Sequence, residues 1–520
     1  MNLHASQAEI DTLESVLRRA APGEGVVATK VALAWHLRQR DSARTLKLVQ
    51  EVMPVVRASR SSTHGDAVAS CHARAALAAA EASALYGELV EAERCLLDAR
   101  ANLNASWDLQ AEGDAWLVES LVARSRGQAE RSLAALRQAS KCFERSDDRE
   151  RLEIARAWIL FESTALQPDG KACEEPMPTP VGLSDPRMAR DAIRCAARAL
   201  ALTSRNPAAA TRAFGQAGDL AHARGLVLLE VTCMLEAGAA IHELGDYDRA
   251  ARCFDAAALR ARATGWPTLI FTCDTHFGVL LCDLGAFDES RRTLEDAIDA
   301  LSARPRGPLL AGAHAALART LLATKRTSES LAQMDAAMAL FRACDSAREL
   351  ALNLILQGRV LCASSQPARA ADVLAEAHAL VESRGFEAMR VRLFQALADL
   401  HHRFTLPAPA DMTLPTGALH FAEAALAHGR RLTGWSARAA LHDFLAERWA
   451  ETGDHQRAYA YARQALAAKE KETAQKMSYP LALLRVRRRA EVRAGPESPF
   501  AALAHGATRH LDDVPGFSAR

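Results

Sequence analysis

A repeat of 40 residues constrains this chain more than any other feature of its sequence. Residues 243–257 (ELGDYDRAARCFDAA) and 283–297 (DLGAFDESRRTLEDA) match in character, and Gly245 and Gly285 lie 40 residues apart. The same step gives two series of turn positions, which are Gly87 and Gly127, and then Arg205, Gly245, Gly285, Lys325 and Ser365. A fixed period of this length indicates stacked supersecondary units that bury their apolar faces only against their neighbours.

Three positions after each turn define one face of a helix. The fifth residue after the turn is small, the ninth is larger and apolar, and the twelfth is always alanine: Ala99, Ala139, Ala217, Ala257, Ala297, Ala337 and Ala377. Spacings of three and four residues share a helix face, so the pattern predicts a second helix with an apolar ridge and small notches. Gly238, Gly278 and Gly358, seven residues before their turns, predict a notch in the first helix as well.

Composition supports helices and excludes several classes of function. Hydrophobic residues make up 49% of the chain and aromatic residues 5%, and alanine, a strong helix former, is abundant. The net charge is +1, so we expect no nucleic-acid or membrane partner. The sequence contains no Gly-rich phosphate loop, GxSxG, HExxH or CxxC motif. We therefore expect no catalytic residue, no metal site and no cofactor, hence no enzyme.

Targeting signals are also absent from the sequence. Residues 1–19 read as a polar amphipathic stretch without the regions of a signal peptide, and no apolar run approaches the length of about 20 residues that crosses a bilayer. The 11 cysteines are scattered among apolar helical positions. These features predict a cytoplasmic protein.

One unit carries a complete family signature. Gly238, the turn Gly245-Asp246-Tyr247, and Ala250, Phe254 and Ala257 resemble the tetratricopeptide-repeat (TPR) family in its longer MalT-like form. The chain is similar to the sensory repeat region of bacterial diguanylate cyclases and regulators, without their output domain. The resemblance implies an all-α, right-handed TPR-like α-solenoid of antiparallel helix pairs. It also implies a non-catalytic scaffold or sensory module in bacterial signalling or regulation; the alternative is a small-molecule effector-binding module of a transcriptional or cyclic-dinucleotide regulator.

Proline-rich stretches and the repeat period suggest the division of the chain. Five prolines in residues 167–186 forbid a helix there. The predicted segments are N-terminal capping helices (1–63), repeats (64–168), a Pro-rich loop (169–186), repeats (187–404), a Pro-rich insertion (405–416), terminal repeats (417–477), a basic connector helix (478–494) and a disordered tail (495–520).

The resemblance assigns the concave surface to residues ten and six positions before each turn. The polar members of this set form the predicted binding groove: Thr275, Arg319, Arg359, Gln395 and Asp399. Arg319 and Arg359 lie one period apart, so they would align on adjacent units and could hold a carboxylate or an acidic peptide. The alternative is that both are ordinary solvated arginines. We expect a protein or peptide partner that carries an acidic group.

Overall fold

The computed structural model describes residues 2–477, apart from 20–23, 59–64, 107, 167–186, 204–205, 304–306, 410 and 434. The predicted loop at 169–186, the connector at 478–494 and the tail at 495–520 lie outside the described residues. The described residues form 22 α-helices and no strand. The predicted all-α, TPR-like solenoid is therefore confirmed.

The first eleven helices are α1 (Gln7–Arg19), α2 (Glu24–Leu37), α3 (Ser42–Ala58), α4 (Gly65–Tyr86), α5 (Leu89–Ser106), α6 (Leu109–Ser125), α7 (Ala129–Arg145), α8 (Arg149–Leu166), α9 (Met188–Thr203), α10 (Pro207–Arg224) and α11 (Val227–Glu243). The remaining helices are α12 (Tyr247–Thr264), α13 (Pro267–Asp283), α14 (Phe287–Ser302), α15 (Pro308–Ala323), α16 (Thr327–Phe341), α17 (Ala347–Ala363), α18 (Pro367–Arg384), α19 (Glu387–Arg403), α20 (Gly417–Gly429), α21 (Ala439–Glu451) and α22 (His455–Met477).

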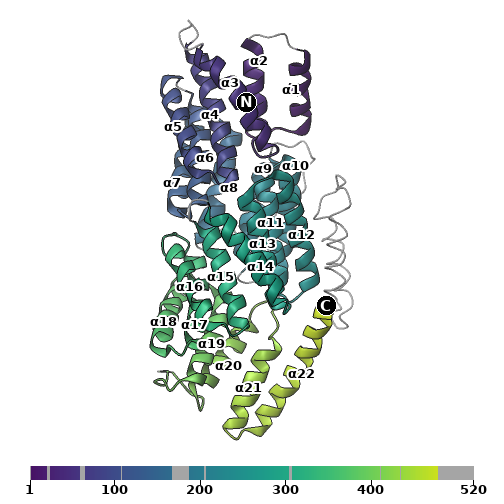
Figure 1. The fold of residues 1–520 in the computed structure, drawn as a ribbon, viewed down its shortest axis with the longest axis vertical. Helices are drawn as coiled ribbons and strands as arrows, with labels where there is room; N and C mark the ends of the chain where they lie inside the picture. The colour runs from purple at the N-terminus through teal and green to yellow at the C-terminus, as the bar shows by residue number, and fades with distance from the viewer. Residues whose placement is uncertain are drawn as a thin grey trace, which may run out of the picture.

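Successive antiparallel pairs stack into an elongated rod (Figure 1). Helices α4 and α5, α6 and α7, and the pairs from α9–α10 to α21–α22 pack against each other, and each pair also contacts its neighbours in sequence. Helices α8 and α9, which flank residues 167–186, pack directly on one another. Residues 404–416, between α19 and α20, contain no helix in their described part.

The predicted notches are the places where helices meet most closely. All seven alanines twelve residues after a turn are 0% exposed. A methyl group on Gly238 would lie 2.5 Å from Phe254 Cε1, and one on Gly278 would lie 2.6 Å from Leu294 Cγ. Only a residue without a side chain permits these crossings, which explains why glycine recurs at this position despite its cost of about 1 kcal/mol in a helix.

Turns keep one backbone conformation whatever their residue type. Gly245 and Gly285 have φ of 81° and 83°, in the left-handed region that glycine favours. Lys325 and Ser365 adopt the same region, with φ of 61° and 57°. The geometry of the repeat, rather than the presence of glycine, therefore fixes the turn.

Consecutive turns of the superhelix touch each other. Trp266 Nε1 donates a hydrogen bond to Ser42 Oγ at 3.0 Å, although 224 residues separate them. Thr268 Oγ1 donates to the Leu85 carbonyl at 3.2 Å. The Asp345 amide likewise donates to the Gly127 carbonyl at 2.9 Å. These contacts join segments that lie between 183 and 224 residues apart in the sequence.

The largest hydrophobic core cluster extends from Leu3 to Leu281 and includes the N-terminal residues. A second cluster covers Ala311 to Leu400, and a third covers Ala398 to Trp449. No helix within the described ranges is both long and apolar enough to cross a membrane.

Candidate functional site

The predicted groove residues come from the first helices of four consecutive pairs. Thr275 lies on α13, Arg319 on α15, Arg359 on α17, and Gln395 and Asp399 on α19. All five are at least partly accessible to solvent. By contrast, Leu235, Ala315 and Ile355, which lie ten residues before their turns, are buried in the core at 3–6% exposure. The expectation that both positions line an open surface is wrong for these three residues, because apolar side chains there pack between neighbouring helices.

Asp283, the last residue of α13, is the centre of the arrangement. Arg319 Nη2 donates to Asp283 Oδ1 at 2.5 Å. His242 Nε2 lies 2.9 Å from Asp283 Oδ2, and Arg438 Nη1 lies 3.9 Å from the same oxygen. Burial alone would raise the pKa of Asp283, but Arg319, His242 and Arg438 outweigh it and hold the pKa well below its usual range. The carboxylate is therefore charged at neutral pH.

Arg359 differs from Arg319, although the two occupy equivalent positions in the repeat. Its side chain is exposed to solvent and makes no ion pair within the described part of the chain. The surrounding protein lowers the pKa of Arg359 by desolvation; Asp399 opposes this effect, and Arg319, on the adjacent unit, adds to it. Burial raises the pKa of Asp399, while Arg359 and Arg403 lower it. Arg359 thus remains a cation without a bound anion.

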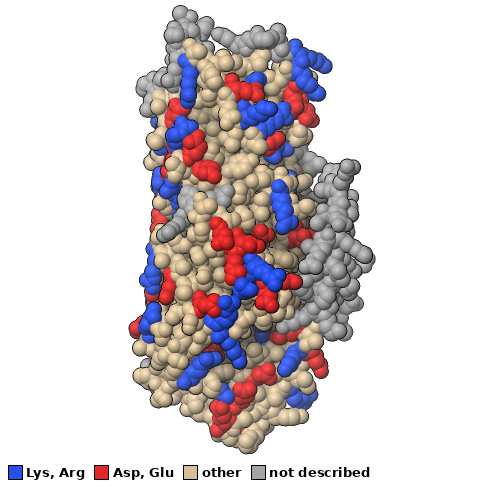
Figure 2. All heavy atoms as spheres, viewed as in Figure 1, with Lys and Arg blue, Asp and Glu red and all other residues tan. Residues whose placement is uncertain are grey.

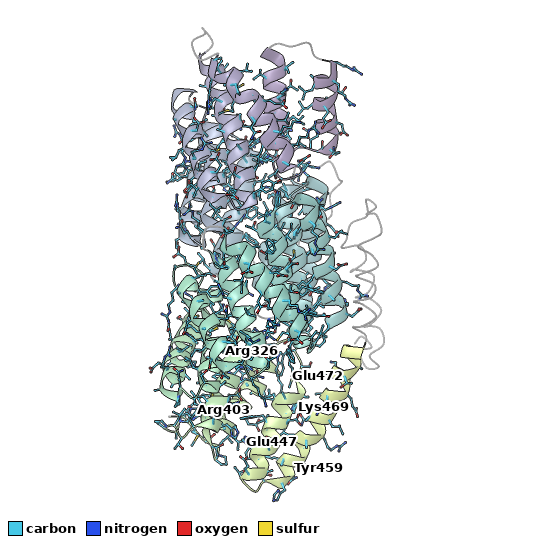
Figure 3. All side chains as sticks on the ribbon, in the orientation of Figure 1. Arg326, Arg403, Glu447, Tyr459, Lys469 and Glu472 are labelled. Atoms are coloured by element: carbon cyan, nitrogen blue, oxygen red, sulfur yellow. The ribbon has the colours of Figure 1, made fainter. Side chains whose placement is uncertain are left out.

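Two further arginines join this cluster from distant parts of the chain. Arg392 on α19 pairs with Glu243 at the end of α11, 149 residues away. Burial lowers the pKa of Arg392 to about 10, with a smaller contribution from Arg438. Arg438 caps the beginning of α21, and α22 is tied to the same point because Glu472 Oε1 accepts a hydrogen bond from the Ala439 amide at 2.8 Å. Figure 3 shows Glu472 on the stretch of α22 that approaches the middle of the rod.

We call this set the central cluster: His242, Glu243, Asp283, Arg319, Arg359, Arg392, Asp399 and Arg438. Sequence reasoning found Arg319, Arg359 and Asp399 but missed the other five. The sequence contained a signal for two of these five, because Glu243 and Asp283 both lie two residues before their turns and thus occupy equivalent positions in the repeat. No local pattern marks Arg392 or Arg438, whose positions depend on the pitch of the superhelix.

Thr275 and Gln395 do not join the central cluster. Thr275 Oγ1 donates to the Phe271 carbonyl of its own helix at 2.8 Å. Gln395 is half-buried and has no side-chain hydrogen bond to the cluster within the described residues. Of the five predicted groove residues, only Arg319, Arg359 and Asp399 therefore belong to the central cluster.

The central cluster has an excess of arginine and no arrangement typical of a metal site. The set contains four arginines and three carboxylates, and the arginine without an ion pair among the described residues, Arg359, favours an anionic group over a cation. Over the described residues, no group of three or more His, Cys, Asp or Glu side chains could hold a metal ion. Figure 2 shows acidic and basic side chains intermingled midway along the rod, without a broad region of one sign. The excess of arginine is therefore confined to the central cluster and does not extend over this face of the rod.

Comparisons with known proteins give loose likenesses. No family model and no curated protein matches the sequence. A Rap protein solved with Competence and Sporulation Factor is similar at 14% identity and a TM-score of 0.41, covering 87% of this chain and 100% of that one. The Rap conjugation gene regulator of plasmid pLS20, in complex with the Phr* peptide, is similar at 12% identity and a TM-score of 0.42, covering 71% and 96%. Yeast Tom70 is similar at 14% identity and a TM-score of 0.34, covering 89% and 92%. At these values the function must be argued from this chain's own residues.

Proposed function

We propose that this protein is a non-catalytic, cytoplasmic TPR-like scaffold in signalling or regulation, and that its central cluster binds an acidic segment of a partner protein or peptide. The observation that carries the proposal is the difference between Arg319 and Arg359. Arg319 is committed to Asp283 at 2.5 Å, whereas Arg359 has solvent access and no ion pair within the described residues. A guanidinium in this setting offers its fork of donors to an incoming carboxylate.

Charged neighbours of both signs act on Arg359. Arg319 and Arg438 repel it and lower its pKa, whereas the carboxylates of Asp399 and Asp283 raise the pKa. An incoming carboxylate relieves this repulsion, while a cation would add to it. Arg438 is the N-cap residue of α21 and Asp283 ends α13, and their side chains lie 3.9 Å apart although 155 residues separate them.

The binding test replaces Arg359 by Glu in the full chain and uses a fluorescein-labelled hexaglutamate peptide as the probe. We expect affinity to fall about tenfold or more, because a charge-assisted pair is lost and a repulsive carboxylate takes its place. Arg369→Glu is the matched control, since it makes the same charge change on exposed surface of α18 in the same unit. Binding of the wild type should also weaken as salt rises.

Two results would contradict the proposal: equal affinity of the Arg359→Glu and Arg369→Glu variants for hexaglutamate, or no saturable binding by the wild type at low salt. Arg319→Glu is not a suitable probe, because it would place a second carboxylate beside Asp283 and destabilise the fold itself. Competition by citrate at similar concentration would favour the small-molecule effector function over peptide capture.

A further inference from the structure

A second candidate binding site lies toward the N-terminal end of the rod, where residues 2–5 enter its interior. Residues 2–6 precede α1 and are not helical. Leu3 is 3% exposed and Ala5 is 2% exposed, and both belong to the largest core cluster. This non-helical segment bends at Leu3 and His4, and it is enclosed by residues of α2, by the turn that follows α2 and by later helices as far along the chain as α10.

Four consecutive carbonyls of this segment each accept a hydrogen bond from a side chain. Trp35 Nε1 donates to the Asn2 carbonyl at 3.0 Å, and Arg38 Nη2 donates to the Leu3 carbonyl at 2.9 Å. Arg224 Nη2 donates to the His4 carbonyl at 2.8 Å, and Arg40 Nη2 donates to the Ala5 carbonyl at 2.9 Å. These donors bind backbone carbonyl groups, which every peptide contains.

The four donors are held in place by contacts of their own. The Arg38 guanidinium stacks over the Trp35 ring at 4.0 Å from its centroid, and its Nε donates to Glu81 at 2.6 Å. Arg40 Nη2 also donates to the Arg224 carbonyl at 3.0 Å. A preorganised set of donors loses little freedom when an extended segment binds.

The segment does not fill the space that it enters. A cavity of about 70 Å³ borders Leu3 and His4 and is also lined by Trp35, Glu81 and Trp158. Burial, together with Arg38, Arg224, Arg151 and Arg40, keeps the pKa of His4 well below its usual value. The position of His4 therefore has room for a larger side chain and disfavours a cationic one.

We propose that the inner surface formed by Trp35, Arg38, Arg40 and Arg224 is a second peptide-binding site. Residues 2–5 occupy it as a tethered ligand, and a non-helical partner segment with an apolar, an uncharged or acidic, and a small residue in succession replaces them. This site is separate from the central cluster. Its donors bind backbone carbonyls, whereas the proposed ligand of the central cluster is a negatively charged group. The tether gives residues 2–5 an effective concentration on the order of millimolar, so a partner binds only by overcoming that competition.

The test uses the full chain with Leu3→Asp, which puts a carboxylate where an apolar side chain is buried and so favours release of the segment. The probe is a fluorescein-labelled synthetic peptide with the sequence of residues 2–9. We expect the Leu3→Asp variant to bind this peptide about tenfold more tightly than the wild type, because the tethered competitor has left. A peptide with His4→Lys should bind more weakly than the unchanged peptide.

A second substitution tests the carbonyl contacts. In the Leu3→Asp background, Arg40→Gln should weaken peptide binding several-fold, because it removes the donor to the Ala5 carbonyl. Arg44→Gln is the matched control, since Arg44 pairs with Glu14 on the exposed surface. The absence of saturable binding by a Leu3→Asp variant of wild-type helicity, or equal binding by the Arg40→Gln and Arg44→Gln variants, would overturn the proposal.

The wild-type chain provides a measurement that does not depend on folding of the variant. Hydrogen–deuterium exchange of residues 2–8 should increase when about 1 mM of a His4→Gln peptide is added, since that peptide has a distinct mass and competes with the tether. Unchanged exchange at saturating peptide would show that residues 2–5 are a fixed part of the core.

Discussion

Asp114 and Asp283 both lie between two arginines, yet their surroundings differ. Asp114, near the N-terminal site, accepts from Arg74 Nη1 at 2.5 Å and Arg151 Nε at 2.9 Å, and these three side chains are 0–5% exposed. Asp283, in the central cluster, is 11% exposed, but its partners Arg319 and Arg438 are 32% and 49% exposed. The first arrangement is sealed within the protein, whereas the second has one buried partner, His242 at 9% exposure, and two arginines that reach solvent.

The comparison separates charges that maintain the fold from charges that are free to bind. Arg74 and Arg151 both pair with Asp114, and the neighbouring pair of Arg38 and Glu81 is also buried. In the central cluster arginine is in excess, and Arg359 has no ion pair among the described residues. A buried charge needs ion-pair or hydrogen-bond partners, whereas a charged side chain on the surface, such as that of Arg359, is tolerated without an ion pair and is accessible to a ligand.

The largest expected effect tests this contrast directly. Asp114→Asn removes the charge that neutralises Arg74 and Arg151 and should lower the free energy of unfolding by about 3–5 kcal/mol, because it leaves buried guanidinium groups underpaired. Asp283→Asn should cost about 1 kcal/mol, since water screens Arg319 and Arg438. Urea unfolding followed by circular dichroism measures both. Equal losses would remove the distinction between the two sites.

A second prediction, with a smaller expected effect on stability, tests whether the two regions also differ in how their helices pack. A methyl group on Gly113 of α6 would lie 2.3 Å from Phe143 Cε1, and one on Gly278 of α13 would lie 2.6 Å from Leu294 Cγ. Gly113→Ala and Gly278→Ala should each lower stability by about 1–3 kcal/mol through overpacking. Similar decreases in the unfolding midpoints of the two variants would indicate that the two regions differ in electrostatics but not in helix packing. A cost at only one glycine would extend the difference to packing.

The smallest effect has the opposite sign. Gly312 lies inside α15, and a methyl group added there would meet no atom within 4 Å. Gly312→Ala should therefore stabilise the protein by up to about 1 kcal/mol, because alanine loses less conformational freedom in a helix. Thermal unfolding of the Gly312→Ala and Gly278→Ala variants, each compared with the wild type, measures the two effects. A decrease in melting temperature would mean that α15 packs more tightly than its surroundings indicate.

Much of the fold was predictable because the repeat is a local signal. The small, large and alanine positions fall on one helix face, and Ser290, Leu294 and Ala297 are each 0% exposed as that face requires. Gly225, Gly265 and Gly385, each twenty residues after a turn position, end their helices in the left-handed region with φ of 67–69°. Helix periodicity and turn chemistry act within one unit, so they are readable without knowledge of the whole structure.

The binding residues were predictable only in part. Arg319 and Arg359 were found as an aligned pair, but the sequence treats them as equivalent, and only the structure distinguishes the arginine that Asp283 holds from the one that it does not. Arg392 and Arg438 carry no signal at all. Their place in the central cluster depends on contacts with Glu243 and Asp283, which lie 149 and 155 residues earlier in the chain.

The sequence by itself determined the helices, their pairing and the notches through which they stack, because each of these depends on residues within about one period of 40. The tertiary structure alone decided which distant residues meet, from the carbonyls of residues 2–5 held by Arg224 to the pairing of Arg392 with Glu243. The physical reason is that small rotations between neighbouring units accumulate along a solenoid. Their sum sets the pitch, and the pitch decides which side chains face one another across the inside of the rod.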